Sequence, residues 1–326
     1  MAGVRRDRVE REYRLAVAAQ QATERTRHAF CSALSRESGE PLTATASRVD
    51  HWLLVEHRAA WGRDPLATRT LSAELVAHLR AQVAALPHAR LLLIKKPGRH
   101  AQTGGRAFLA TSRPGQERLL ELEFEQPDDL LEVDIPTEIA GAGRATLSEG
   151  PLWIVCTHGK RDRCCALHGR PLYDALRQEV DSTGVWQSTH VGGDRFAGNV
   201  VVLPHGLYYG RVDPREVAGL VAAHADGRID LARYRGRSAW PFAVQAAEHA
   251  LREAEGLAGI ADLELVRNVR GDNGERCVSF RTPDRAVHEL RVSGSLADDA
   301  TYLTCDSVEP RRARRWRVTA HDVLSR

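Results

Sequence analysis

Three of the six cysteines of this 326-residue chain lie within ten positions, in the segment Cys156–Cys165, CTHGKRDRCC. They follow the apolar run Leu152–Val155, so Cys156 stands where a buried strand is expected to end. Thiolates grouped at a strand end suit three chemistries: a nucleophile, a redox dithiol, or ligands of a metal ion or iron–sulfur cluster. The spacing of the neighbouring residues discriminates among them.

The spacing disfavours the nucleophile and the dithiol. A phosphatase-type nucleophile needs an arginine six residues after the cysteine, but Asp162 occupies that position, and its charge would repel phosphate. A redox dithiol needs Cys-x-x-Cys at a helix start. The chain has no such motif, and the adjacent Cys164 and Cys165 would form a strained disulfide. Ligation is the chemistry that the pattern favours.

Ligation needs further donors from a neighbouring strand end. The next predicted strand leads into Thr189–Asn199, THVGGDRFAGN, where Val191 and two glycines separate His190 from Asp194. Two successive glycines permit a tight turn and the close approach of another group. Both side chains can therefore face one point, which makes His190 a candidate ligand.

These two motifs resemble those of the sucrase/ferredoxin-like family, whose core is a thioredoxin-like [2Fe-2S] ferredoxin. The resemblance extends over residues 151 to about 255 and includes LPHGLYYGRV and the RGRS-x-x-P-x-x-VQAAE stretch. Carried over by position, it implies that Cys156, Cys165 and His190 bind the cluster and that Cys164 does not.

One position departs from the family pattern, because the second histidine ligand of the family falls on Asp194. The fourth ligand is therefore open between Asp194, His158 and Cys164, and a site without a fourth ligand would bind no cluster. The alternative cofactor is a structural zinc ion in tetrahedral geometry. The metal ligands expected for either cofactor are Cys156, Cys165, His190 and Asp194.

Hydrophobic periodicity predicts the elements that position these residues. Residues 146–258 follow the order strand, helix, strand, strand, strand, helix, which is typical of a thioredoxin-like ferredoxin domain of the α/β class. Its first helix is expected to begin near Pro171, because proline is favourable at a first helical position. The other elements expected here are strands at 152–155, 185–189, 200–203 and 207–209, and helices at 213–225 and 242–255.

Residues 1–145 are predicted to be an α/β region that repeats this order. After a charged, helix-like N-terminal stretch, apolar runs flank a helical period, two short strands follow, and 127–143 is expected to be a polar connector. The segment Leu53–Glu56 resembles Trp153–Cys156 and lies 100 residues before it, which indicates a degenerate thioredoxin-like copy with Glu56 in place of Cys156. The next segment, Gly62–Leu66, resembles Gly169–Leu172.

The remaining residues, 259–326, contain alternating apolar runs that predict a small β-rich C-terminal region. Its arginine-rich run, 311–317, is interpreted as a solvated strand end or loop, because the net charge is only +3 and no recognition helix is evident. No nucleic-acid partner is therefore expected. Three isolated cysteines are predicted to be small buried hydrophobic residues: Cys31, Cys277 and Cys305.

Composition gives the expected compartment: 43% of the residues are apolar and 27% are charged, as in ordinary globular proteins. No uninterrupted apolar stretch approaches about 18 residues, and the N-terminus has no apolar leader, so no membrane partner is expected. Cysteines clustered in this way are typical of a reducing compartment, and a cytoplasmic location is expected.

The leading functional hypothesis is an iron–sulfur protein that carries single electrons or senses redox state, with an unidentified redox partner protein. A hydrolase is the alternative that the family name implies, and it would need a carboxylate pair such as Asp162 and Asp194. Four cations are expected to offset part of the charge of the site, and they form either a solvated loop or a docking face for an acidic partner: Lys160, Arg161, Arg163 and Arg195.

Overall fold

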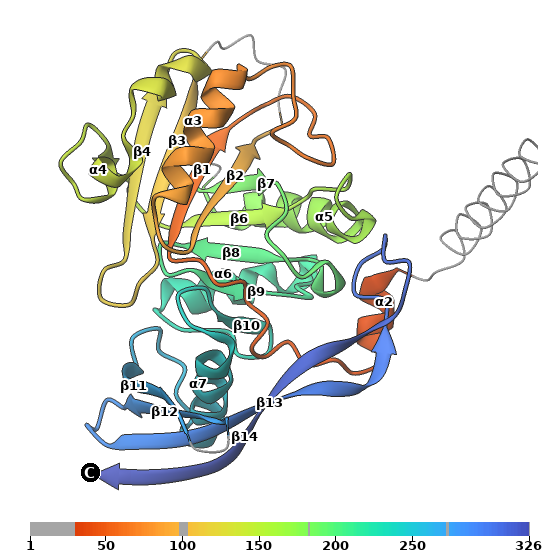
Figure 1. Ribbon diagram of the computed structural model, residues 1–326, viewed down its shortest axis with the longest axis vertical. Helices are drawn as coiled ribbons and strands as arrows, with labels where there is room; N and C mark the ends of the chain where they lie inside the picture. The colour runs from red at the N-terminus through yellow and green to blue at the C-terminus, as the bar shows by residue number, and fades with distance from the viewer. Residues whose placement is uncertain (1–29, 98–103, 182, 272–273, 326) are drawn as a thin grey trace, which may run out of the picture.

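The computed structural model describes residues 30–97, 104–181, 183–271 and 274–325 (Figure 1). The charged N-terminal stretch that was predicted to be helical lies outside these residues. Two sheets, one of ten strands and one of four, form the framework. No helix in the described ranges is both long enough and apolar enough to cross a membrane.

The first half of the large sheet surrounds a buried central strand, β1. This strand pairs in parallel with β2 and antiparallel with β3, which in turn pairs with β4. The helix α3 follows β1 and is capped by Ser72, whose Oγ accepts the N–H of Leu75 at 3.1 Å. The elements of this half are β1 (His51–Glu56), α3 (Ala73–Ala84), β2 (Ala89–Lys95), β3 (Gly105–Thr111), β4 (Arg118–Phe124), α4 (Ile135–Ile139) and β5 (Thr146–Leu147).

The second half repeats this topology around β6, all of whose residues are buried. β6 pairs in parallel with β7 and antiparallel with β8, and β8 pairs with β9. Glu56 and Cys156 are thus the last residues of the central strands of two thioredoxin-like halves, as the similarity of the two sequence segments predicted. The elements are β6 (Leu152–Cys156), α5 (Arg163–Glu179), β7 (Val185–Ser188), β8 (Val200–Leu203), β9 (Leu207–Tyr209), α6 (Val217–Ala225) and β10 (Tyr234–Arg237).

The two halves are joined into one sheet by β2 and β7, which pair antiparallel at Ile94↔Ser188 and Lys95↔Gln187. In Figure 1 the strands β1–β4 stand roughly upright, whereas β6 and β8 lie across the page. Side chains of the two halves meet in one core: the rings of Phe108 and Trp186 are 5.6 Å apart. Burial of this apolar surface holds the halves together.

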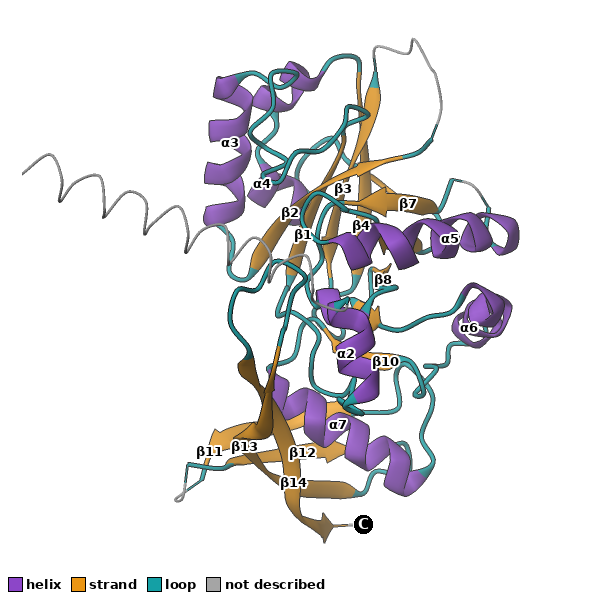
Figure 2. Cartoon of the chain, turned by 90° about the vertical axis from the view of Figure 1, so that its right-hand side faces the viewer, coloured by secondary structure: helices purple, strands orange, loops and turns teal. Residues whose placement is uncertain are grey.

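The C-terminal region is a four-stranded antiparallel sheet packed against α7 (Phe242–Glu255), as Figure 2 shows. Their shared core contains Val244 and Leu251 of the helix and Phe280 of the sheet. The last two strands form a hairpin whose tip, residues 302–310, reaches α2 (Cys31–Glu37) (Figure 1). The strands are β11 (Glu264–Arg270), β12 (Arg276–Arg281), β13 (Val287–Thr301) and β14 (Arg311–Ser325). The predicted fold class, including the β-rich C-terminal region, is confirmed.

Three local predictions were wrong. Helix α5 begins at Arg163 rather than near Pro171, which lies inside the helix, because Asp162 provides an N-cap. Gly169–Leu172 is therefore helical, whereas Gly62–Leu66 lies in a loop, and the echo between them has no structural counterpart. Residues 127–143 are not a purely polar connector, since they form a 3-10 helix and α4 and bury apolar side chains: Leu130, Val133 and Ile135.

Candidate metal centre

Cys156 and Cys165 come together because α5 packs very closely on β6. Cys156 is the last residue of β6, Cys165 lies in the first turn of α5, and both are 1% exposed. The backbones approach closely at Gly169, where an added Cβ would overlap the carbonyl oxygen of Cys156. Glycine at this position therefore allows the helix to bring Cys165 to the strand end.

The double glycine gives the second motif its shape. Gly192 and Gly193 have φ angles of +101° and +80°, which side chains with a Cβ rarely adopt. The turn places Asp194 at the start of a short 3-10 helix, Asp194–Phe196, and returns its carboxylate towards His190. The predicted role of the glycines is thus borne out by the backbone.

The buried side chain of Arg235 holds this turn in place. It is 1% exposed, and its Nη1 donates to the carbonyl of Gly192 at 3.0 Å and to Oδ1 of Asn199 at 2.8 Å. Burial lowers the pKa of its guanidinium to about 10, so the group stays positively charged at neutral pH. Sequence analysis missed this residue, although it begins the RGRS stretch that carries the family resemblance.

The predicted ligands meet at one point, Nδ1 of His190. This atom lies 3.9 Å from the sulfur of Cys156, 3.8 Å from that of Cys165 and 2.9 Å from Oδ1 of Asp194. The same Asp194 oxygen is 3.5 Å from the sulfur of Cys165. The donor atoms of Cys156, Cys165 and His190 all lie within 4.8 Å of one another. The Asp194 carboxylate lies outside this group of three and contacts it through His190 and Cys165.

The two other candidates for a fourth ligand have contacts outside this group. Nε2 of His158 lies 2.7 Å from the carbonyl oxygen of Gly62, whereas its Nδ1 is buried without a hydrogen-bond partner. The sulfur of Cys164 is 3.3 Å from that of Cys305 and 3.6 Å from that of Cys31. Of the three candidates, it is Asp194 that makes direct contacts with Cys165 and His190.

The protons of the site are distributed unequally. The hydrogen bond from Cys165, and to a lesser extent the one from His190, holds the pKa of the Cys156 thiol well below its usual range. The hydrogen bond between the two cysteines raises the pKa of the Cys165 thiol. Burial alone would lower the pKa of His190, but the Asp194 carboxylate and Cys156 raise it to about 9. A cation that binds these donors must therefore displace protons from Cys165 and His190.

The four predicted cations differ in their surroundings. Lys160, Arg161 and Arg163 are exposed around the first turn of α5. Arg195 is instead half-buried in an ion pair with Glu40, with its Nε 2.8 Å from the carboxylate. The exposed basic surface is thus smaller than the sequence predicted.

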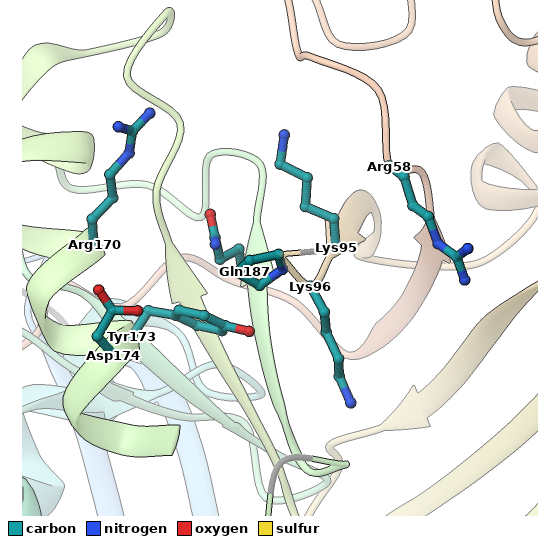
Figure 3. A pocket seen from close by; sticks show the side chains of 8 residues that line it. Arg58, Lys95, Lys96, Arg170, Tyr173, Asp174 and Gln187 are labelled. Carbon is teal, nitrogen blue, oxygen red and sulfur yellow. The ribbon is translucent and has the colours of Figure 1, made fainter. Parts of the chain in front are cut away.

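A second basic region lies beside the end of β6, in a pocket of about 410 Å³. Figure 3 shows Lys95 and Lys96, successive residues at the end of β2, pointing to opposite sides, and Arg170 and Asp174 across the pocket from them. Burial and then the charge of Arg170 lower the pKa of Lys95. The lining also contains Arg58, so this pocket is predominantly positive.

The carboxylates considered for hydrolysis are both buried and engaged. Asp162 is 2% exposed, and its two oxygens accept the backbone N–H groups of Cys164 at 2.8 Å and Cys305 at 2.7 Å. Asp194 is 5% exposed and contacts His190. Neither lines the basic pocket, so the geometry gives no support to this pair as a hydrolytic acid and base.

Cys31 and Cys305 were predicted to be isolated, and this was wrong, because both contact Cys164. Both are buried, and their side chains share a small cluster. Cys277 stands apart from them on β12 and is half-buried. No sequence signal could have grouped Cys31, Cys164 and Cys305, because their spacing along the chain follows no motif.

Fold and site together define a thioredoxin-like α/β protein with a thiol and imidazole centre at the end of its second central strand. The family model described as sucrase/ferredoxin-like matches residues 42–236, and the chain belongs to this family. The match covers both thioredoxin-like halves as far as β10.

Curated relatives include "altered inheritance of mitochondria protein 32" of two yeasts. The protein of Meyerozyma guilliermondii is 41% identical over 95 residues, which are 26% of this chain and 34% of the relative. That of Debaryomyces hansenii is 35% identical over 95 residues, covering 26% of this chain and 35% of the relative. The chain thus spans about a third of the length of these curated relatives.

Among solved structures, the thioredoxin-like [2Fe-2S] ferredoxin of Aquifex aeolicus is 21% identical to this chain. The match covers 29% of this chain and 97% of that protein, with a TM-score of 0.26. The strand order and pairing described above, rather than this score, define the fold of the second half.

Proposed function

We propose that this protein binds a [2Fe-2S] cluster through Cys156, Cys165, His190 and Asp194, and that it acts as a one-electron carrier or redox sensor. The observation that carries the proposal is the meeting of both thiols and the carboxylate at Nδ1 of His190, within 3.9 Å. Membership of the sucrase/ferredoxin-like family supports the choice of cluster.

The donor set fits such a cluster chemically. Two thiolates supply the soft ligands that iron–sulfur centres require, and histidine in place of cysteine is known in Rieske centres. When bound, the cluster would supply reversible one-electron chemistry. The chain's own contribution is to bury the thiols and to hold the turn after His190 through Arg235. The side chain of His190 is left 21% exposed, and it is the route by which electrons would reach the surface.

We further propose that an acidic redox partner docks near this edge. Exposed Lys160 and Arg161 lie on the loop between Cys156 and α5, and the basic pocket with Lys95 and Arg170 lies between the end of β2 and α5. Opposite charge on a partner would steer association and make it sensitive to ionic strength. A reducing compartment such as the cytoplasm suits a chain whose six cysteines are all free.

A structural zinc ion is the second candidate, because Nδ1 of His190 lies 3.9 and 3.8 Å from the two sulfurs and an Asp194 oxygen lies 3.5 Å from the sulfur of Cys165. Donors around one tetrahedral zinc ion are separated by about 3.5–3.8 Å. The same four side chains would then fix the strand end, the helix start and the glycine turn to each other.

Metal analysis of the full chain, purified without oxygen, distinguishes the two candidates. The cluster predicts about two irons and two sulfides per chain together with a brown colour. Cys156→Ser should bleach this colour, whereas Cys277→Ser, a matched control on β12, should leave it unchanged. A colourless protein whose Cys156 site holds zinc instead would contradict the proposal.

A further inference from the structure

A second group of thiols lies at the start of α5 and is separate from the first centre, which consists of Cys156, Cys165, His190 and Asp194. It joins three segments that are distant in the sequence: α2 with Cys31, the first turn of α5 with Cys164, and the hairpin tip with Cys305. The three sulfurs form a nearly regular triangle with sides of 3.6, 3.3 and 3.6 Å. All three side chains are buried, the most exposed at 6%.

Asp162 completes this group. Its carboxylate oxygens lie 3.9 and 3.8 Å from the sulfur of Cys31, and they accept the backbone N–H groups of Cys164 and Cys305. One donor atom from each of the four residues lies within 4.8 Å of all the others. The backbone hydrogen bonds fix the carboxylate in place and leave each oxygen with a further lone pair.

The spacing of the sulfurs matches ligation better than disulfide chemistry. A disulfide has an S–S distance of about 2.05 Å. A tetrahedral zinc ion that binds each sulfur at about 2.3 Å holds the sulfurs about 3.8 Å apart, close to the 3.3–3.6 Å observed. Asp162 caps α5 and accepts two backbone N–H groups, and a cation bound among the thiols would also neutralise its buried negative charge.

We propose that Cys31, Cys164 and Cys305 bind one zinc ion, with Asp162 as the fourth ligand. Binding replaces the thiol protons, which are released to solvent, with the metal. The site does not depend on the cofactor of the first centre. Adjacent residues Cys164 and Cys165 face different sides of α5, so each serves its own site.

This zinc site ties α2 and the tip of the β13–β14 hairpin to the second thioredoxin-like half. Cys31 anchors α2, and Cys305 anchors the tip of the β13–β14 hairpin. An ion pair between Arg63 and Asp306 holds the same tip to the loop after β1. The metal therefore closes two long loops of chain at once, where a cross-link stabilises most.

The test uses the full chain with Cys156→Ser and Cys165→Ser, which removes the first centre and keeps the second. Incubated with Zn²⁺ alone, and separately with Co²⁺ as a coloured probe, it should bind one ion per chain and show the thiolate charge-transfer and tetrahedral bands of cobalt. Cys305→Ser in this background should weaken zinc binding more than about 100-fold, beyond the effect of losing an outer hydrogen-bond partner. Cys277→Ser should change nothing.

Absence of zinc and cobalt binding by the double variant, or full zinc affinity in Cys305→Ser, would overturn the proposal. A disulfide among the three cysteines in protein purified without oxygen would overturn it as well. If Cys305→Ser fails to fold, native mass spectrometry of the parent chain and of the Cys156→Ser, Cys165→Ser double variant decides instead. One zinc retained by the double variant supports this proposal, whether or not the parent also holds iron and sulfide. Zinc that is lost with the first centre, or a parent with iron and sulfide but no zinc, overturns it.

Discussion

At the scale of single residues, Asp194 is the position that most affects the redox properties we propose. Asp194→His exchanges a carboxylate for a neutral imidazole and so removes one negative charge beside the thiols. A less negative site accepts an electron more readily, so the reduction potential should rise, by less than the several hundred millivolts that separate Rieske centres from all-cysteine ones. Potentiometry of parent and variant measures the difference. An unchanged potential would mean that Asp194 does not bind iron.

His224 provides a residue-scale prediction that is independent of any metal. Its ring packs edge-on against Trp153 with centroids 5.3 Å apart, and burial, with a smaller effect of His205, lowers its pKa to about 4. The unfolded chain takes up this proton near pH 6.5 and the folded chain does not, so stability is lost as the pH falls from about 6.5 to about 4.

The predicted size of this loss is about 3 kcal/mol, from a pKa lowered from 6.5 to about 4. His224→Phe keeps an aromatic ring against Trp153 and removes the titration. Urea unfolding of both proteins across this pH range measures the effect as the difference between them. Parallel pH profiles for parent and variant would contradict the prediction.

At the scale of elements, the contact between α5 and β6 is the feature on which the first centre depends. Gly169→Ala should destabilise the fold by about 1–3 kcal/mol, because the added methyl group overlaps the carbonyl of Cys156. It should also weaken metal binding by moving Cys165 away from the strand end. Urea unfolding and metal content measure the two effects.

A matched control exists on α6, where an added Cβ at Gly219 meets no heavy atom within 4 Å. Gly219→Ala should therefore be neutral or stabilise the chain by up to about 1 kcal/mol. Equal effects of the two substitutions would show that helix propensity, rather than the contact with β6, governs both.

The elements also show how far the sequence was informative. Strands such as β8 and β9 and the helix α7 were predicted at their observed bounds, because apolar runs and Pro241 mark them locally. The start of α5 was not, since the N-cap Asp162 competes with a conspicuous proline nine residues further on. Local patterns identify elements, but which of two start signals acts is decided by packing.

The residues of the two candidate sites also differ in whether local sequence patterns could identify them. Cys156, Cys165 and His190 could be named because two short motifs carry them and adjacent strand ends bring those motifs together. Cys31 and Cys305 could not, because their approach to Cys164 depends on where α2 and the hairpin tip dock. Contacts made by docking of distant segments leave no periodic trace in the sequence.

At the scale of the whole molecule, the predicted division into residues 1–145, 146–258 and 259–326 remains a prediction about folding units. The pairing of β2 with β7 and the core that both halves share argue for coupling across the first boundary. The ring contact between Trp52 and Tyr208, 6.1 Å apart, joins strands at distant places in the sheet order. We therefore expect the full chain to unfold in a single transition, with far-ultraviolet circular dichroism and tryptophan fluorescence coinciding.

A fragment that begins at residue 146 tests this coupling. It retains β6, α5 and the first thiol centre, but it exposes the faces of Ile154, Trp186 and Tyr208 that the first half covers. Uncovered apolar surface of this kind favours aggregation or a loosely packed state. The fragment should therefore lack near-ultraviolet circular dichroism and bind a hydrophobic dye, even with metal supplied. If it is monomeric and unfolds cooperatively, the second half is an autonomous domain and the shared sheet is only a docking interface between two folded units.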